Sequence, residues 1–152
     1  MQNLFPRTLT RRTYTRRKKI IMVGDTVGDL IVRLKNAGMV GKETVSVPYS
    51  KLRHAVLNKL VEAGYIKAAT EQGKEVQEKT LEVTLNYEGG EHRIHGVKRI
   101  SKPGRRLYSK VSEIHPVKFG KGHMILSTPA GILTNEEAKE KNVGGEQLFI
   151  IW

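Results

Sequence analysis

The feature of this sequence that most constrains the fold is a change in the spacing of its apolar residues. In the first half, two stretches repeat apolar residues every three or four positions, the period of a helix packed on a core. From residue 81 to residue 87, apolar and polar residues alternate strictly, the period of a strand with one buried face, and the chain beyond is rich in strand patterns. Helices followed by a run of strands are typical of α+β proteins, and we predict that class here.

Both helical stretches have recognisable ends. The first begins after Asp25, a preferred N-cap residue, and stops at Gly38. Its inward residues are Val27, Leu30, Ile31 and Leu34. The second begins at Ser50 and stops at Gly64. Its inward residues are Leu52, Val56, Leu60 and Val61. Between the two helices, alternating valines predict a short strand over residues 45–48.

The rest of the chain is expected to be rich in strands. A Gly89–Gly90 turn leads into one long strand over residues 91–100, with a bulge at Gly96 where the alternation slips. One short helix interrupts the strands, because Thr134 and Glu137 have the spacing of a capping box. Tyr65 and Ile66 lead into a further strand, and the other expected strands lie at residues 81–87, 107–111, 123–126 and 147–152.

We expect two small domains that divide near Tyr87–Gly90. The N-terminal domain, residues 22–88, has helices packed on a small sheet, and the C-terminal domain, residues 89–152, is mainly antiparallel β with one short helix. Residues 1–21 contain seven Lys or Arg and no acid, so we expect a disordered basic N-terminal arm. Two interpretations of the arm stay open: it condenses on phosphates, or it has no role and Met22 is the native start.

The net charge of +12 indicates an anionic partner, since such an excess otherwise only adds self-repulsion. Nucleic acid is the leading candidate, and a membrane surface or other polyanion bound through residues 1–21 is the second. No apolar run approaches the roughly 18 residues that span a bilayer, and the N-terminus lacks the apolar core of a secretory signal. The absence of cysteine excludes disulfides and thiolate metal sites. We therefore expect a cytoplasmic protein with no membrane partner.

Catalytic, cofactor and metal sites find little support in the motifs. Ser127 follows an apolar run, but no G-x-S-x-G elbow surrounds it, so a turn or binding residue is favoured over a nucleophile. The stretch from Gly38 to Thr44 lacks the first glycine and the final hydroxyl residue of a phosphate-binding P-loop. His92 and His95 lie three positions apart in a strand pattern, where they face opposite sides. We expect no enzyme, no cofactor and no metal.

Two loops carry residue types that bind RNA. The stretch KRISKPGRRLY, residues 98–108, groups five cations on a Pro-Gly turn beside Tyr108. Cations pair with phosphates, and a tyrosine stacks or donates a hydrogen bond. A solvated loop explains the same composition equally well. In LSTPAGILT, residues 126–134, Ser127 and Thr128 precede a turn, and small hydroxyls fit the wide, shallow minor groove of an RNA helix.

Four segments together resemble one protein family. They are GDTVGDLIVRLKNA (24–37), VPYSKLRHAVLNKLVEAGYI (47–66), RISKPGRRLY (99–108) and GHMILSTPAGILTNEEAKEKNVGGEQLFIIW (122–152). In order and separation they resemble the bacterial small-subunit ribosomal protein S-eight family. The resemblance implies a structural protein of the ribosomal 30S subunit that binds the central domain of 16S rRNA directly and helps to assemble the platform. It also implies small-subunit proteins five and twelve as neighbours and, for some bacterial members, a site in the messenger RNA of their own operon.

The resemblance assigns RNA-binding roles to residues in both halves of the chain. The C-terminal half would recognise an irregular helix with unpaired bases, and the N-terminal half would add contacts to the RNA backbone. The residues carried over are Ser101, Lys102, Arg106, Tyr108, Ser127, Thr128, Gly144, Gly145, Glu146, Arg33, Lys35 and Lys51. Glu146 is unusual beside an anionic ligand, and two roles stay open: it accepts from base amines, or it holds the opposing loop in place.

Three features depart from the family pattern. Members often have Ser-Thr-Ser-Lys-Gly in the hydroxyl loop, where Pro129 and Ala130 remove a hydroxyl and a cation from this chain. Arg105 adds a charge at a position that is often apolar, and residues 1–21 have no counterpart in typical members. We expect Pro129 to stiffen the turn, which lowers the ordering cost of binding.

Overall fold

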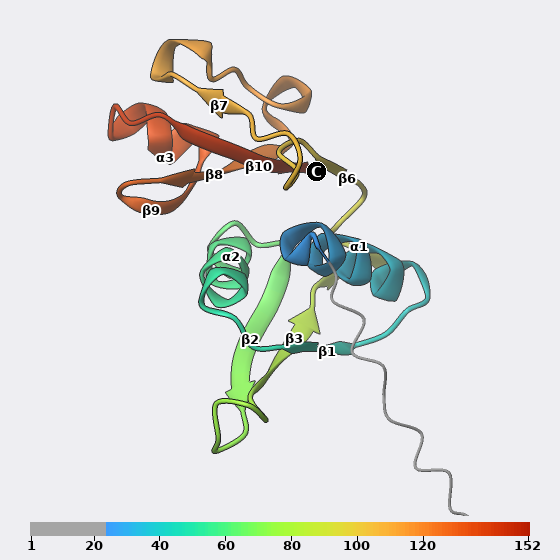
Figure 1. The fold of residues 1–152 in the computed structure, drawn as a ribbon. Coiled ribbons are helices and arrows are strands. Elements are labelled where there is room, and N and C mark those ends of the chain that lie inside the picture. The colour runs from blue at the N-terminus through green and yellow to red at the C-terminus, as the bar shows by residue number, and fades with distance from the viewer. Residues whose placement is uncertain (1–23) are drawn as a thin grey trace, which may run out of the picture.

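Two helices lie between two antiparallel sheets in the computed structural model, which describes residues 24–152 (Figure 1). Helices α1 (Thr26–Met39) and α2 (Lys51–Glu62) pack on a sheet formed within residues 44–85 and also contact the sheet of the C-terminal half. This arrangement confirms the predicted α+β class. The basic segment 1–21, expected to be a disordered arm, lies outside the described residues.

Helix α1 begins as predicted at Asp25, whose Oδ1 accepts the Gly28 N–H at 3.0 Å. All four predicted inward residues of this helix are buried. The predicted stop at Gly38 is wrong, because the helix continues to Met39. Gly38 instead lies against the His92 ring, and a Cβ at this position would overlap the ring atoms. This glycine therefore allows close packing and does not terminate the helix.

Helix α2 follows Ser50 as predicted, and Gly64 lies just beyond its end with a φ of +83°. One inward residue of α2 is wrongly predicted: Leu52 is 39% exposed, whereas Leu57 is fully buried. The first inward position is taken by Arg53, which is buried although it is a cation. Its Nη1 donates to the Pro48 carbonyl oxygen at 3.1 Å, so this charge stabilises the fold.

The first sheet has the strand order β1-β3-β2, and both strand pairs are antiparallel. Its strands are β1 (Thr44–Pro48), β2 (Ile66–Gln72) and β3 (Thr80–Leu85). The alternation of residues 81–85 appears in the structure as predicted, because Leu81, Val83 and Leu85 are buried and the residues between them are half-buried. The face of β3 that carries these three buried residues packs in the same core as the two helices.

The single strand predicted over residues 91–100 is wrong. The chain instead forms a short hairpin of β4 (Tyr87–Glu88) and β5 (Glu91–His92), and then joins a different sheet through β6 (Val97–Arg99). The break coincides with Gly96, where a Cβ would overlap the ring of Trp152. The strand predicted at 107–111 is also shorter, since β7 (Tyr108–Ser109) is followed by a 3-10 turn (Val111–Glu113).

The second sheet has the order β6-β10-β8-β9, with β7 also paired to β10 (Figure 1). Its long strands are β8 (His123–Thr128) and β10 (Gly145–Ile151). Strand β9 (Gly131–Thr134) was not expected, because four residues after a turn are too few to show alternation. Helix α3 (Asn135–Glu140) starts with the predicted capping box, in which Thr134 and Glu137 each bind the other's backbone N–H.

One apolar core joins the helices to both sheets, and it includes Leu60 of α2 and Phe149 of β10. A smaller cluster lies under α3. The Lys59 ammonium also links the halves, because it donates to Glu137 Oε1 at 3.0 Å. Burial raises the pKa of Glu137, but the Thr134 N–H and Lys59 lower it by more, so the carboxylate stays ionised. The domain boundary near residue 88 stays a prediction.

Candidate nucleic-acid interface

The cations of the SKPGRR stretch lie on a loop that projects from an edge strand. β6 and β7 pair with successive parts of the same edge of β10. Between them, Ser101 N–H donates to the Gln147 carbonyl oxygen and Gln147 N–H donates to that of Leu107. Residues 97–109 are thus one interrupted edge strand, and residues 102–106, here named the basic loop, leave it and return.

The basic loop has a defined shape. The backbones of Lys102 and Arg105 exchange two hydrogen bonds of 2.9 Å, with Pro103 and Gly104 at the tip. Lys102, Arg105 and Arg106 are exposed. A closed turn of this kind presents its cations from a fixed backbone, which lowers the entropy lost when an anion binds.

Glu146 ties the base of the basic loop to β10. Its Oε1 accepts the Ser101 hydroxyl at 2.5 Å and the Arg106 Nη1 at 3.2 Å. Ser101 is fully buried, and its hydroxyl oxygen also accepts the Leu107 N–H at 3.3 Å. The geometry therefore shows Glu146 holding the opposing loop, the second of the two roles considered for it. The Ser101 hydroxyl faces inward and supports this loop.

Tyr108, Glu146 and Ser127 form a row across three neighbouring strands. Glu146 pairs directly with Tyr108 of β7 on one side and with Ser127 of β8 on the other. Residues directly opposite each other in an antiparallel sheet project to the same face, so the three side chains share one surface. Tyr108 is 69% exposed. Thr128, next along β8, donates its hydroxyl to the Gly131 carbonyl oxygen at 2.8 Å and keeps its acceptor capacity.

Gly144 and Gly145 allow the strands beneath this row to approach closely. A Cβ on Gly144 would overlap the Ser109 carbonyl oxygen, and one on Gly145 would overlap that of Ser127. In both cases the obstacle is backbone, which cannot move without disturbing strand pairing. The two glycines thus set the spacing of the row.

A small cleft connects the row to the starts of the two long helices. It has a volume of about 260 Å³, and its lining includes Ser127, Glu146 and Arg106 on one side and Asp25 and Leu52 on the other. Lys51, exposed at the first position of α2, is adjacent to Leu52. Of the predicted residues, Arg106, Ser127 and Glu146 line the cleft, and Lys51 is the sequence neighbour of a lining residue.

An ion pair forms part of the cleft wall. Arg99 Nε lies 3.0 Å from Asp25 Oδ2, and its Nη1 donates to the Leu148 carbonyl oxygen at 2.6 Å. Burial raises the pKa of Asp25, but Arg99 and the Gly28 N–H lower it by more, so it lies below the usual value. The sequence did not predict this pair, because its members are 74 residues apart and the local sequence around one residue gives no indication of the other.

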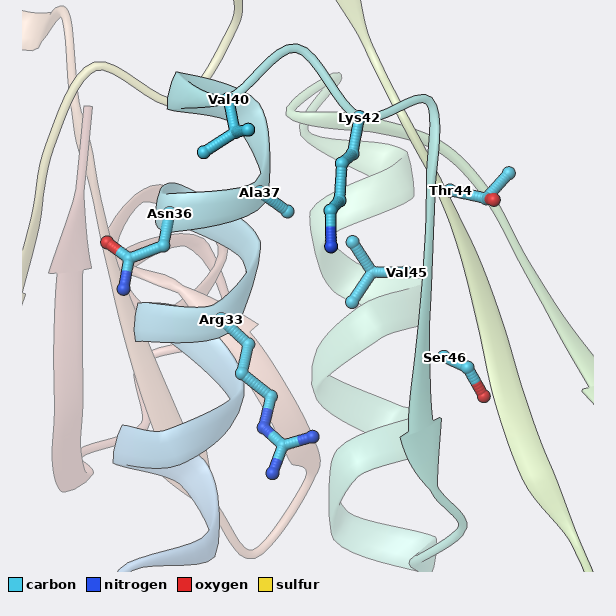
Figure 2. A pocket seen from close by; sticks show the side chains of 8 residues that line it. All are labelled: Arg33, Asn36, Ala37, Val40, Lys42, Thr44, Val45 and Ser46. Atoms are coloured by element: carbon cyan, nitrogen blue, oxygen red, sulfur yellow. The ribbon is translucent and has the colours of Figure 1, made fainter.

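The structure does not bring the α1 cations into the cleft. Arg33 lines a separate groove between α1 and β1, with a volume of about 440 Å³; Lys42 also lines it, and the two side chains extend in the same direction along the groove (Figure 2). Arg33 Nε also lies 2.9 Å from Asp29 Oδ2. Lys35 is half-buried on another part of α1. The predicted site is therefore divided between the sheet surface and α1.

The described residues also bear on metal binding and on membrane crossing. Within residues 24–152, no group of three His, Asp or Glu side chains is arranged to hold a metal ion. In the same range, no helix is both long and apolar enough to cross a membrane.

Comparisons with known proteins point to one family. Residues 25–152 match the family model for ribosomal protein S8. Small ribosomal subunit protein uS8 of Mycoplasmopsis synoviae is 44% identical over 128 residues, which cover 84% of this chain and 97% of that protein. The protein of the same name from Hyphomonas neptunium is 46% identical over 126 residues, covering 83% and 95%. The corresponding protein of Dictyoglomus thermophilum is 45% identical over 130 residues, covering 86% and 98%.

These matches cover nearly the whole described chain and nearly the whole of each relative. They confirm the resemblance inferred from the four sequence segments, together with the expected non-enzymatic role in the ribosome. The chain belongs to the ribosomal protein S8 family, whose members are structural proteins of the small ribosomal subunit.

Proposed function

We propose that this chain binds the central domain of 16S rRNA directly and helps to assemble the platform of the small subunit. The observation that carries the proposal is the row of Tyr108, Glu146 and Ser127 beside a basic loop that Glu146 anchors. An exposed tyrosine, small hydroxyls and clustered cations on one rigid surface match a helix with unpaired bases.

Each member of this surface has a distinct role in the proposal. Lys102, Arg105 and Arg106 pair with phosphates and supply affinity without sequence preference. Tyr108 stacks on a base or sugar, and Ser127 and Thr128 hydrogen-bond to base edges and 2′-hydroxyls in the shallow minor groove. These contacts supply the specificity.

Glu146 supports binding although it carries a negative charge. Its side chain is 13% exposed and is shared between Ser101 and Arg106, so little of its charge faces an approaching phosphate. Without Glu146, Arg106 would be free to turn and the base of the loop would lose its link to β10. Gly144 and Gly145 keep the three strands close enough for the row to act as one surface.

The N-terminal half adds phosphate contacts in this proposal. Lys51, exposed at the first position of α2 and next in sequence to the cleft residue Leu52, extends the positive surface from the sheet to α2. Neither Arg33 nor Lys35 lines the cleft. In this proposal they therefore contact a second stretch of RNA backbone, from α1. Small-subunit proteins five and twelve are proposed as neighbours in the subunit, and the messenger RNA of its own operon as a second RNA partner.

The test compares a central-domain fragment of 16S rRNA with an unrelated hairpin of equal length at the same salt concentration. We expect the fragment to bind at least about a thousandfold more tightly, the lower range for specific recognition. Affinity for both RNAs should fall as salt rises, with a log–log slope near −0.9 for each phosphate neutralised on a duplex. Equal affinity for the two RNAs would contradict the proposal.

A further inference from the structure

A pocket at the opposite end of the C-terminal sheet is not part of the surface described above. It lies where β8 begins and β10 ends, between Trp152, Tyr65 and the turn at residues 118–121, and has a volume of about 570 Å³. Ser127 is four residues along β8 from His123 of this pocket, which corresponds to about 13 Å of strand. The volume falls within the range of roughly 300 to 1,000 Å³ typical of ligand pockets.

We propose that this pocket binds an unstacked nucleotide of single-stranded RNA, with the base on the aromatic side chains and the phosphate on the surrounding cations. The site is separate from the Tyr108–Glu146–Ser127 row and does not depend on the function proposed for that row.

Two aromatic rings of the pocket are held in place before any ligand binds. The Trp152 carbonyl oxygen accepts the His95 and Gly96 N–H groups at 2.7 and 3.0 Å, and its indole packs directly on Gly96. The Tyr65 hydroxyl lies 2.7 Å from His123 Nδ1, and the two rings meet edge to face. Rigid aromatic surfaces lose little entropy when a base packs against them.

A third ring, Phe119, is presented outward by an unusual turn. Lys118 and Phe119 have φ values of +48° and +56°, and Gly120 follows with +83°. Left-handed backbone is unfavourable for side chains of this size. Phe119 is nonetheless fully exposed, so burial of the ring does not explain the turn. A planar, solvent-facing ring beside a pocket is the kind of platform on which bases stack.

The charges around the pocket favour a phosphate. Lys118 Nζ lies 4.5 Å from the centre of the Trp152 ring, and the Arg93 guanidinium lies 6.0 Å from that of Tyr65. Lys121 adds a third cation, and the lining contains no Asp or Glu. Glu88 approaches Arg93 from outside the lining, at 3.8 Å. Aromatic rings alternating with cations are typical of sites that track a single strand, where stacking is tolerant of base identity.

Trp152 is the single tryptophan of the chain, so its fluorescence reports on this pocket alone. The full-length protein is titrated with a 5′-phosphorylated tetranucleotide RNA at fixed salt while tryptophan emission is recorded. We expect saturable quenching, and Phe119→Ala should weaken the apparent affinity at least about fivefold, as for loss of one stacked base. Because Phe119 is exposed, this variant should fold, which circular dichroism checks.

Three controls separate the proposal from its alternatives. Lys121→Ala should weaken binding, whereas Lys139→Ala, an exposed lysine on α3, should not. The variant Ser127→Ala with Thr128→Ala should leave quenching unchanged, so a failure of the proposed function and a failure of this pocket are distinguishable. If a capped tetraglutamate peptide quenches the tryptophan as strongly as the RNA does, the pocket binds an acidic protein segment, and the proposal that it binds a nucleotide is wrong. Absence of quenching would overturn the site itself.

Discussion

At one end of β8 and β10, a carboxylate holds one cation of the basic loop, whereas at the other end cations surround aromatic rings with no carboxylate in the pocket lining. Glu146 joins Ser101 and Arg106 at the first end, and Lys118 lies directly over Trp152 at the second. An anchored cation has one position and suits a ligand of fixed shape, such as an irregular RNA helix. An unanchored cation beside a ring can adjust to different single-stranded ligands.

The glycines at the two ends differ in the same way. A Cβ on Gly145 would overlap backbone, the Ser127 carbonyl oxygen, whereas the atoms nearest to a Cβ on Gly96 belong to the Trp152 side chain. Gly104, at the tip of the basic loop, has open space around it. The first end therefore depends on the spacing of two strands, and the second depends on the packing of one side chain against a glycine.

The largest expected effect is a difference in the free energy of unfolding between glycine variants at the two ends of the sheet. Overpacking typically costs about 1–3 kcal/mol; we expect Gly145→Ala to lower the free energy of unfolding by the upper part of that range, because the obstacle is backbone, and Gly96→Ala by about 1 kcal/mol, because the nearest obstacle is a side chain. Gly104→Ala, the matched control, should stay within about 0.5 kcal/mol of the parent. Urea unfolding measures all three. The comparison fails if Gly145→Ala is as stable as Gly104→Ala.

The next prediction concerns the anchor itself. Glu146→Ala should lower the free energy of unfolding by about 1–3 kcal/mol, because the buried Ser101 hydroxyl and Arg106 lose a charged partner. It should also weaken binding to the central-domain fragment, measured by titration at fixed salt. Glu140→Ala, which removes an exposed acid on α3, is the control. A gain in affinity in Glu146→Ala would mean that Glu146 only repels RNA.

A smaller effect should appear in acid at the cleft. Because the pKa of Asp25 in the folded protein lies below 3.8, its charge stabilises the fold above about pH 4, and this stabilisation is lost as the pH falls through that lowered pKa. Asp25→Asn keeps a residue that caps helices but removes the charge that pairs with Arg99. The variant should be about 1 kcal/mol less stable near pH 6.

The difference between Asp25→Asn and the parent protein should shrink as the pH falls below 3.8, and unfolding curves between pH 2.5 and 6 measure it. A difference that does not change over this range would show that the ion pair contributes nothing.

The smallest expected effect tests a single phosphate contact of the basic loop. Lys102→Ala should weaken binding to the central-domain fragment and to an unrelated hairpin by a similar factor, and it should reduce the salt slope by about one unit. Affinities measured at four or more salt concentrations give the slope. A Lys102→Ala slope equal to that of the parent protein would remove Lys102 from the interface.

Periodic patterns predicted the parts of the fold that local sequence determines. The stripe of α1, the alternation in β3 and the capping box of α3 depend on residues close in sequence, and all three occur in the structure. The strand predicted over 91–100 was wrong because Gly96 packs against Trp152, 56 positions away along the chain, and no local pattern carries that contact. Leu52 was misassigned because buried Arg53 takes the inward position.

The sequence named residues of the candidate site but not the geometry that relates them. Resemblance to the family named Tyr108, Ser127 and Glu146, and only the strand register shows that they are directly opposite one another. The inward-facing Ser101 hydroxyl and the pairing of Asp25 with Arg99 depend on tertiary contacts between distant segments. Sequence patterns gave no indication of either.

The central claim is that the Tyr108–Glu146–Ser127 surface supplies specificity for RNA. Its most direct test is the ratio of affinities for the central-domain fragment and an unrelated hairpin, measured for the parent protein and for Ser127→Ala combined with Thr128→Ala at one salt concentration. The claim predicts that the ratio falls about tenfold or more in the variant, with hairpin affinity unchanged, as expected for lost hydrogen bonds to bases. An unchanged ratio, or an equal loss for both RNAs, would contradict it.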